Sequence, residues 1–245
     1  MTSIKLYNGD CLDIMPNIPD KSIDMIFADL PFGTTQNKWD CLIDLDKLWE
    51  QYKRIIKDNG CIALWCQVPF NITLGYSNLK MLKYEWIIEK TNATGHYNAK
   101  KMPMKAHENI MIFYKNVPTY NPQKTTGHKP VNTYTKHTDD GSNYGSSIIG
   151  RSGGGQTDRY PRDVLKFKWD TQKSSLHPTQ KPIAACEYFI STYSNEGDTI
   201  LDNCMGSGTT GEACSRLNRN FIGIELDPKY FKIAQERIKK GQIQK

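Results

Sequence analysis

The stretch from Thr199 to Gly211, Thr-Ile-Leu-Asp-Asn-Cys-Met-Gly-Ser-Gly-Thr-Thr-Gly, is typical of a strand, a tight turn and the start of a helix. Gly206, Gly208 and Gly211 follow the G-x-G-x-x-G spacing, in which glycines let the backbone approach a ligand closely. The next expected strand ends at Glu225, 19 residues after Gly206, where a carboxylate can bind both hydroxyls of a ribose. The pattern predicts a ligand that carries an adenosine.

Asp202 lies at the tip of the first of these strands. A carboxylate there would gain little from a pyrophosphate, but it can accept a hydrogen bond from a ligand ammonium group or from a water molecule beside it. A ligand with a cationic amino-acid tail therefore fits better than a dinucleotide, which favours S-adenosylmethionine. The glycine spacing taken alone is explained equally well by an ordinary strand-to-helix turn with glycine for packing.

Strand-like and helix-like segments alternate along the chain. Runs of apolar and β-branched residues predict seven strands, over 4–7, 23–28, 61–65, 85–89, 109–114, 199–202 and 221–225. Helical spacing predicts helices over 45–56, 182–193, 209–217 and 228–239. We expect Asp58-Asn59-Gly60 to stop the first helix and Asp227 to cap the last. The alternation predicts an α/β fold with a mostly parallel, doubly wound sheet of seven strands.

Residues 116–175 interrupt this alternation. They hold 7 of the 18 glycines and four prolines, and their apolar residues follow neither the helical nor the strand spacing for long. Connections in compact domains usually have about 4 to 6 residues, so we expect this irregular insert to be functional or partly disordered. Residues 80–175 also carry 16 basic and 8 acidic side chains, whereas the two flanking segments are close to neutral. Such a segment can attract nucleic acid, although a solvated lysine-rich surface has the same charge.

The tetrapeptide Asp29-Leu30-Pro31-Phe32 directly follows the expected strand 23–28, at the sheet edge where α/β enzymes bind ligands. A carboxylate, a proline-fixed backbone and an aromatic ring form a compact clamp for a planar ring that bears an amino group. Asp29 and the carbonyl oxygen of Leu30 would accept the two amine N–H bonds, and Phe32 would stack on the ring.

These motifs resemble those of a known family. Asp29-Leu-Pro-Phe32 is similar to the (Asp/Asn/Ser)-Pro-Pro-(Tyr/Phe) motif of DNA amino-methyltransferases, and the turn at 202–210 resembles their S-adenosylmethionine motif. His177-Pro-Thr-Gln-Lys-Pro182 resembles the segment that precedes the cofactor motif. The order, with the catalytic motif first, resembles the β group, in which the methyltransferase sheet is circularly permuted. The resemblance covers nearly all of the chain outside 116–175. It departs from the motif at Leu30, usually a proline, where a main-chain contact should tolerate the change.

The resemblance implies a division of the chain and a role for each motif residue. Residues 1–115 would be the catalytic half of the methyltransferase domain, 116–175 a target-recognition insert, and 176–245 the S-adenosylmethionine-binding half of the same domain. The target base would be held by Asp29, Leu30, Pro31 and Phe32. The cofactor would be held by Asp10 and Cys11 at its adenine, Thr179 and Lys181 at its carboxylate, Asp202, Met205, Gly206, Ser207 and Gly208 around its methionine part, and Glu225 at its ribose. Asp10 as a helix cap and Lys181 as a solvated lysine stay open as alternatives.

The implied activity is site-specific methylation of double-stranded DNA. Hydrogen bonds to Asp29 and to the Leu30 carbonyl would localise the lone pair of the exocyclic N6 of a flipped-out adenine, which would then attack the sulfonium methyl in line. A Pro-Cys nucleophile is absent from the sequence, so a covalent enzyme intermediate is not expected. In the family, Asp at the first motif position tends to accompany adenine-N6 and Ser cytosine-N4 activity, so cytosine-N4 methylation is the nearest alternative. RNA and protein-glutamine substrates also stay open, but Asp at position 29 and the circular order favour DNA.

Two further alternatives belong to other classes. A nucleotide-dependent oxidoreductase would use the glycine turn and Glu225, but it leaves Asp29 to Phe32 unexplained and leaves about 20 residues after Glu225, where a dinucleotide fold usually continues. A nucleic-acid-binding module without catalysis would use the positive charge, but it gives no reason for the glycine turn. Binding of S-adenosylmethionine or of NAD would separate them.

Composition excludes several classes of protein. The 245 residues are 38% hydrophobic and 24% charged, which is typical of a globular domain and excludes a disordered, collagen-like or coiled-coil chain. The apolar runs are too short for a membrane span, and the N-terminus does not resemble a signal peptide, so we expect a cytoplasmic protein. Seven cysteines without a CxxC pair suggest neither a disulfide framework nor a zinc site; we expect buried thiols. Some family members are dimers, so a homodimer is open, as is a restriction partner.

Overall fold

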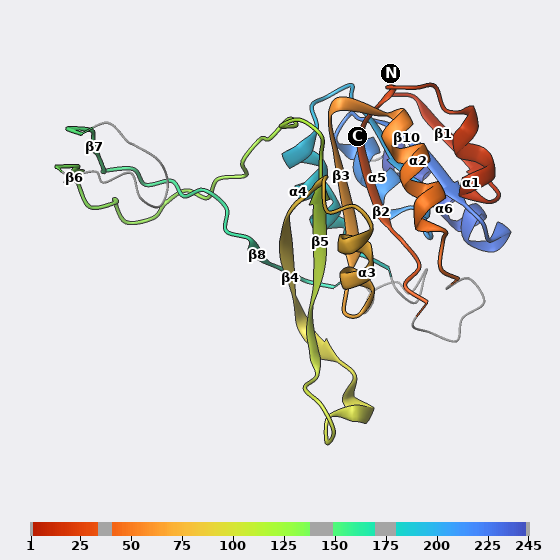
Figure 1. Ribbon diagram of the computed structural model, residues 1–245, viewed down its shortest axis with the longest axis horizontal. Helices are drawn as coiled ribbons and strands as arrows, with labels where there is room; N and C mark the ends of the chain where they lie inside the picture. The colour runs from red at the N-terminus through yellow and green to blue at the C-terminus, as the bar shows by residue number, and fades with distance from the viewer. Residues whose placement is uncertain (1, 34–40, 138–148, 170–179, 244–245) are drawn as a thin grey trace. The chain divides into compact units, whose positions relative to one another are not determined.

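The computed structural model describes residues 2–33, 41–137, 149–169 and 180–243. The chain divides into two compact units. The larger consists of Met1–Asn121 and Asp163–Lys245, and the smaller is Pro122–Arg162. The larger unit contains the sheet and its covering helices (Figure 1).

Eight strands form the sheet of the larger unit, in the order β1-β10-β9-β2-β3-β5-β4-β8. In that order they span Ile4–Asn8, Asn220–Glu225, Thr199–Asp202, Ile23–Asp29, Ile56–Cys66, Lys105–Phe113, Leu82–Thr94 and Val164–Phe167. Neighbouring strands are parallel, except that β5 is antiparallel to both β3 and β4. The mostly parallel sheet predicted from the sequence is therefore confirmed, and each of the seven predicted strands is present.

The eighth strand, β8, corrects the predicted count. It lies inside the expected insert and pairs with β4 from Ile87↔Val164 to Lys90↔Phe167. Its residues are exposed or half-buried, because it forms the edge of the sheet. Asn121 also belongs to the larger unit, and its side chain donates hydrogen bonds to the carbonyl oxygens of Ser191 and Ser194. The separate unit is thus shorter than the expected insert 116–175.

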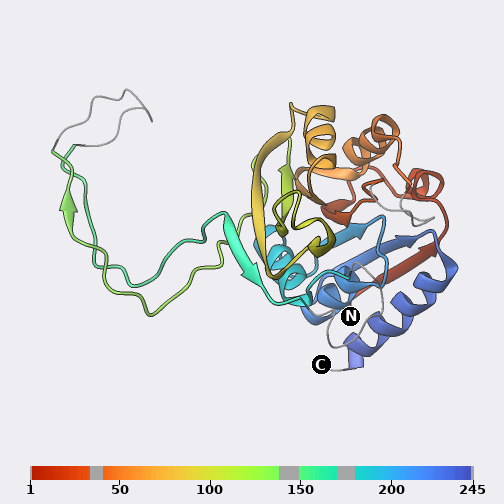
Figure 2. The same ribbon diagram turned by 90° about the horizontal axis from the view of Figure 1, so that it is seen from below.

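Helices cover both faces of the sheet (Figure 2). One face packs against α1 (Cys11–Ile14), η1 (Met15–Asn17), α2 (Leu45–Ile55) and α3 (Phe70–Ser77), and the other against α4 (Ile183–Tyr193), α5 (Thr209–Arg216) and α6 (Pro228–Ile243). Strand β2 supplies both cores, because alternate side chains point to opposite faces. Ile26 and Ala28 join the first cluster, and Met25 and Phe27 the second. Truncating Phe27 to alanine would cost about 3 to 5 kcal/mol of stability.

The end of α2 differs from the prediction. The helix ends at Ile55, and Asp58-Asn59-Gly60 lies within β3 rather than stopping the helix. Gly60 is required for close packing: a Cβ atom there would lie 2.7 Å from Ile56 Cδ1 and 2.9 Å from the carbonyl oxygen of Asp24. Helix α3 was not predicted, since its apolar residues do not gather on one face. The predicted cap of α6 is present, where Asp227 Oδ1 accepts a 2.7 Å hydrogen bond from Lys229 N.

The sheet places two distant motifs at one edge. β2 and β9 are neighbours, with Met25 opposite Ile200 and Ile26 opposite Leu201. Because both strands run in the same direction, their last residues, Asp29 and Asp202, end at the same edge. Chain order reverses between these strands, which is where open α/β sheets bind ligands.

The smaller unit is an extended two-stranded segment. It contains β6 (Tyr134–Thr135) and β7 (Ser152–Gly153), which pair antiparallel, and a single bridge joins Thr125 to Arg159. Most of its described side chains are exposed. β4, β5 and the short turn η2 (His96–Asn98) between them belong to the larger unit. No helix within the described ranges is long and apolar enough to cross a membrane.

Candidate active site

A cavity of about 760 Å³ opens at the carboxyl edge of the sheet. Of the predicted site residues that the structure describes, those that line it are Asp10, Cys11, Asp29, Leu30, Pro31, Phe32, Lys181, Asp202, Met205, Gly206, Ser207 and Glu225. Thr179 lies outside the described residues. The structure therefore brings the two sequence motifs, which are about 170 positions apart, into one cavity.

Gly208 is the one described residue of the predicted site that is not among those lining the cavity. Its φ of 78° is in the left-handed region, and a Cβ atom at this position would lie 2.9 Å from Ala234 Cβ and 3.0 Å from Ala234 Cα. Glycine at this position therefore lets the start of α5 pack closely on α6. Gly208 therefore shapes the turn, and its contact with the cofactor stays a prediction.

The turn after β9 is held by the end of β10. Gly206 N donates a 2.8 Å hydrogen bond to Glu225 Oε2, and Asp227 N donates one of 2.8 Å to Glu225 Oε1. Burial raises the pKa of Glu225, while these backbone N–H groups act in the opposite direction. Each carboxylate oxygen retains a second lone pair that can accept a ligand hydroxyl.

Asp202 is almost completely buried, with 3% of its surface exposed, and it lines the same cavity. Its Oδ1 accepts a 3.1 Å hydrogen bond from Cys204 N. Burial raises the pKa of Asp202 to about 7, against the lowering effects of hydrogen bonds from Thr210 and Cys204. A buried carboxylate that is costly to ionise favours a ligand that brings a positive charge.

Asp10 and Cys11 close this end of the cavity. Asp10 Oδ1 accepts a 2.8 Å hydrogen bond from Leu12 N and caps α1, so the residue both caps a helix and lines the cavity. Cys11 and Cys204 flank the amide of Asn203, whose Nδ2 lies 3.5 Å and 3.4 Å from the two sulfur atoms. The hydrogen bond with Cys204 lowers the pKa of Cys11. Five cysteines are buried as expected; Cys204 is half-buried and Cys41 is exposed.

Asp29 belongs to a row of alternating charges at the other end of the cavity. Lys181 Nζ lies 3.1 Å from Asp29 Oδ2 and 2.7 Å from Glu108 Oε2. Lys90 Nζ lies 2.7 Å from Glu108 Oε1. Lys181 was expected beside the cofactor carboxylate, but the structure places its ammonium group between two carboxylates at the clamp. Its contact with the cofactor carboxylate stays a prediction.

The charged groups of this row shift the pKa values of their neighbours. Burial alone would raise the pKa of Glu108, but the ammonium groups of Lys181 and Lys90 lower it to about 2. Burial would likewise lower the pKa of Lys181, but Asp29 and Glu108 raise it above its usual value. Glu108 and Lys181 therefore both stay charged at neutral pH. The ion pair with Lys181 restricts the direction in which the Asp29 carboxylate points.

Aromatic rings surround this row. The Lys181 ammonium group lies 4.9 Å from the Trp65 ring centroid, and that of Lys90 lies 5.3 Å from Trp169. The Phe32 and Phe70 rings stack with centroids 5.3 Å apart. Trp65, Trp169 and Phe32 all line the cavity. Hydrogen-bonding groups beside flat apolar surfaces suit a planar heterocycle with an amino group.

Sequence reasoning missed several members of this row. Glu108, Lys90, Trp65 and Trp169 were not predicted, although all of them line the cavity. Glu108 lies one residue before the predicted strand 109–114, and a charged residue next to a buried apolar run is a signal that could have identified it. Within the described part of the chain, no three His, Cys, Asp or Glu side chains are placed to hold a metal ion.

Comparisons with known proteins identify the family. The model of the DNA methylase family, which comprises N6 and N4 methyltransferases, matches residues 23–236. The chain belongs to this family. It is 27% identical over 265 residues to the type II methyltransferase M.HinfI of Haemophilus influenzae, covering 96% of this chain and 68% of that protein. The predicted resemblance to the DNA amino-methyltransferases is confirmed.

Solved structures agree with this assignment. The methylase matches M1.HpyAVI, solved as a complex with S-adenosylmethionine, with a TM-score of 0.64 and 25% identity over 96% of this chain and 99% of that one. It also matches the cytosine-N4-specific PvuII DNA methyltransferase with a TM-score of 0.69, covering 100% of this chain and 93% of that one. Identity to the latter is 15%, so that likeness concerns the fold alone.

S-adenosylmethionine is the cofactor of the methylase, and the cavity fits it. The buried Asp202 carboxylate could accept its ammonium group, the Glu225 carboxylate could accept its ribose hydroxyls, and Gly206 leaves the turn without a side chain. When bound, the cofactor supplies an electrophilic methyl group.

Proposed function

We propose that the methylase modifies the exocyclic N6 of adenine in double-stranded DNA, with the target base turned out of the helix into the cavity. The observation that carries this proposal is the position of Asp29, a carboxylate at the end of β2, which lies in the same cavity as Asp202 and is fixed by Lys181. Paired adenine does not expose its amine to an enzyme, so the base has to leave the stack.

The residues of the clamp would act on the amine together. Asp29 accepts a hydrogen bond from one amine N–H, and the carbonyl oxygen of Leu30 accepts one from the other. These bonds draw the nitrogen lone pair out of the ring and direct it toward the methyl group. Phe32, held against Phe70, stacks on the base, and Pro31 fixes the turn that positions all three groups.

The remaining residues at the edge of the sheet would hold the cofactor. Asp202 binds the ammonium group, and Glu225 binds the ribose hydroxyls. The adenine and methionine ends contact Asp10, Cys11, Met205, Gly206 and Ser207. Glu108 and Lys90 do not touch either substrate in this scheme; they position Lys181 and, through it, Asp29.

The choice of adenine rests on the residue at position 29. Family members that methylate cytosine N4 tend to have serine there, whereas adenine enzymes tend to have aspartate. The larger purine ring also gains more stacking area on Phe32. The experiment is to methylate plasmid DNA with the purified methylase, digest it to nucleosides and identify the modified base by mass spectrometry. N6-methyldeoxyadenosine is expected, and methylation confined to deoxycytidine would overturn the adenine assignment.

We further propose that the smaller unit, Pro122–Arg162, selects the DNA sequence. It forms a compact unit of its own, separate from the unit that contains the sheet. Exchanging this unit for that of another family member should change the methylated sequence, mapped by single-molecule sequencing, while cofactor affinity stays the same. An unchanged site preference would contradict this role.

A further inference from the structure

The hairpin between β4 and β5 extends beyond the sheet (Figure 1). β3 pairs with β5 only as far as Asn109, and β8 pairs with β4 only as far as Lys90. Beyond these points the two strands pair only with each other, up to Thr94 and Lys105, among the described residues. An isolated pair of strands is only marginally stable in water. Contact with a binding partner would stabilise this extension.

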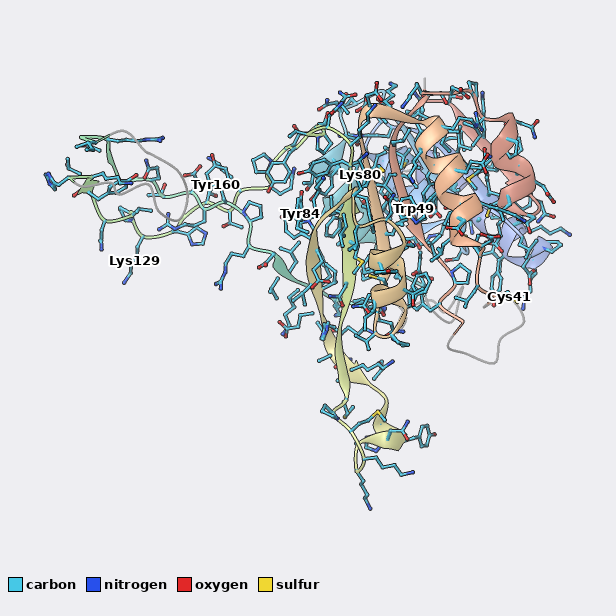
Figure 3. The ribbon with its side chains drawn as sticks, in the orientation of Figure 1. Cys41, Trp49, Lys80, Tyr84, Lys129 and Tyr160 are labelled. Atoms are coloured by element: carbon cyan, nitrogen blue, oxygen red, sulfur yellow. The ribbon has the colours of Figure 1, made fainter. Side chains whose placement is uncertain are left out.

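The extension carries basic side chains and no acidic ones. Residues 91–107 contain three lysines and two histidines and no acidic residue. Every side chain in this range is exposed, and long side chains extend from the tip of the hairpin (Figure 3). A surface of this kind attracts a polyanion.

Large apolar side chains are also exposed at the tip. Tyr97 is as exposed as in an open chain (102%), and Met102 is 54% exposed. Single exposed apolar residues are common, but these two lie close in sequence beside Lys100 and Lys101. An aromatic ring among positive charges is the combination that binds nucleic acid through both base stacking and phosphate contacts.

The far end of the hairpin forms part of the cavity lining. Thr94, Gly95, Asn98 and Lys105 line it, together with Asp29. A nucleotide whose base reaches Asp29 would therefore enter a cavity that this hairpin helps to line. The same DNA molecule could therefore contact the hairpin and place its target base in the cavity.

We propose that the tip of the β4–β5 hairpin is a DNA-binding element distinct from the smaller unit. Lys100 and Lys101 bind the phosphates that flank the target nucleotide, and Tyr97 packs against the bases that the extruded base leaves behind. This inference rests on the proposed function, since it requires a target base that leaves the helix. It assigns the hairpin to base extrusion and sequence selection to Pro122–Arg162.

The charge part is tested by the double variant Lys100→Ala/Lys101→Ala. Its matched control is Lys239→Ala/Lys240→Ala, which removes two adjacent exposed lysines of α6 that do not line the cavity. DNA affinity is measured by fluorescence anisotropy over a series of salt concentrations. Loss of two phosphate contacts should lower the slope of log affinity against log salt by about 2 in the hairpin variant. The control should match the wild type, and equal slopes in both variants would overturn the proposal.

The stacking part is tested at Tyr97. With 2-aminopurine at the target position, Tyr97→Ala should lower the fluorescence increase on binding and slow single-turnover methylation about tenfold, while Tyr97→Trp keeps both. Cofactor affinity should be unchanged in each. Equal behaviour of the Ala and Trp variants would overturn the role of the ring. A change in oligomeric state in place of DNA affinity would show that the hairpin serves a second copy of the chain, and would also overturn the proposal.

The two proposals fail in different ways. Recovery of the methyl group in deoxycytidine would overturn the adenine assignment but leave the salt-slope result intact. Unchanged salt slopes with an N6-methyladenine product would overturn the hairpin proposal and leave the adenine assignment standing.

Discussion

The acidic residues at the two ends of the cavity differ in their partners. Asp202 and Glu225, at the cofactor end, are buried, and the described lysines and arginines form no ion pair with either of them. Asp29 and Glu108, at the target end, share Lys181, and Glu108 also binds Lys90. The first pair lacks a positive charge, and the second is already neutralised. The difference supports the proposal that Asp202 receives the cationic group of the cofactor, whereas Lys181 holds the Asp29 carboxylate in one direction.

The largest effect is expected at Asp29. Asp29→Ala should lower methyl transfer by about a thousandfold or more, because the amine loses its anionic hydrogen-bond acceptor. Binding of S-adenosylmethionine should stay within about twofold, since the carboxylate contacts the target base. Transfer of labelled methyl groups and calorimetry measure the two quantities. Asp58→Asn is the control, an exposed acid paired with Lys21 and Lys115 outside the cavity. Near-normal turnover of Asp29→Ala would show that the clamp is assigned incorrectly.

The opposite result is expected at the cofactor end. Asp202→Ala combined with Glu225→Ala should weaken cofactor binding by about a hundredfold or more, because two charge-assisted contacts are lost. Calorimetry measures the affinity, and thermal unfolding shows whether the variant is folded. A folded double variant with wild-type affinity would remove these acids from the cofactor site.

A smaller effect is expected at Glu108, whose proposed role is positioning. Glu108→Gln removes the charge that Lys181 and Lys90 share, so Asp29 should be held less firmly. We expect kcat to fall about tenfold while the KM for the cofactor is unchanged. Glu89→Gln is the matched control, because Glu89 of β4 pairs with Lys166 of β8 and is not among the residues that line the cavity. A rise in KM for the cofactor without a fall in kcat would contradict a positioning role.

Patterns of neighbouring residues predicted the strands and the two motifs, but not the pairing of distant charges. Thr199 to Asp202 and Ile23 to Ala28 are apolar runs whose burial follows directly from composition. Strand β8 was missed because its four residues are at most half-buried at the sheet edge, where the apolar signal is weak. Lys181 and Glu108 are 73 positions apart, so only the folded sheet shows that they meet. The family resemblance predicted that Lys181 belongs to the site, but it did not predict the ion pair of Lys181 with Glu108.

The division between the two ends is tested most directly by the pH dependence of S-adenosylmethionine affinity. Because burial raises the pKa of Asp202 to about 7, the free protein holds a proton there below that pH, and binding a cation requires its release. Affinity should therefore rise about tenfold from pH 6 to pH 8 in the wild type. Asp29→Asn should show the same rise, and Asp202→Asn should bind weakly with little pH dependence. An unchanged rise in Asp202→Asn, or its loss in Asp29→Asn, would contradict the account.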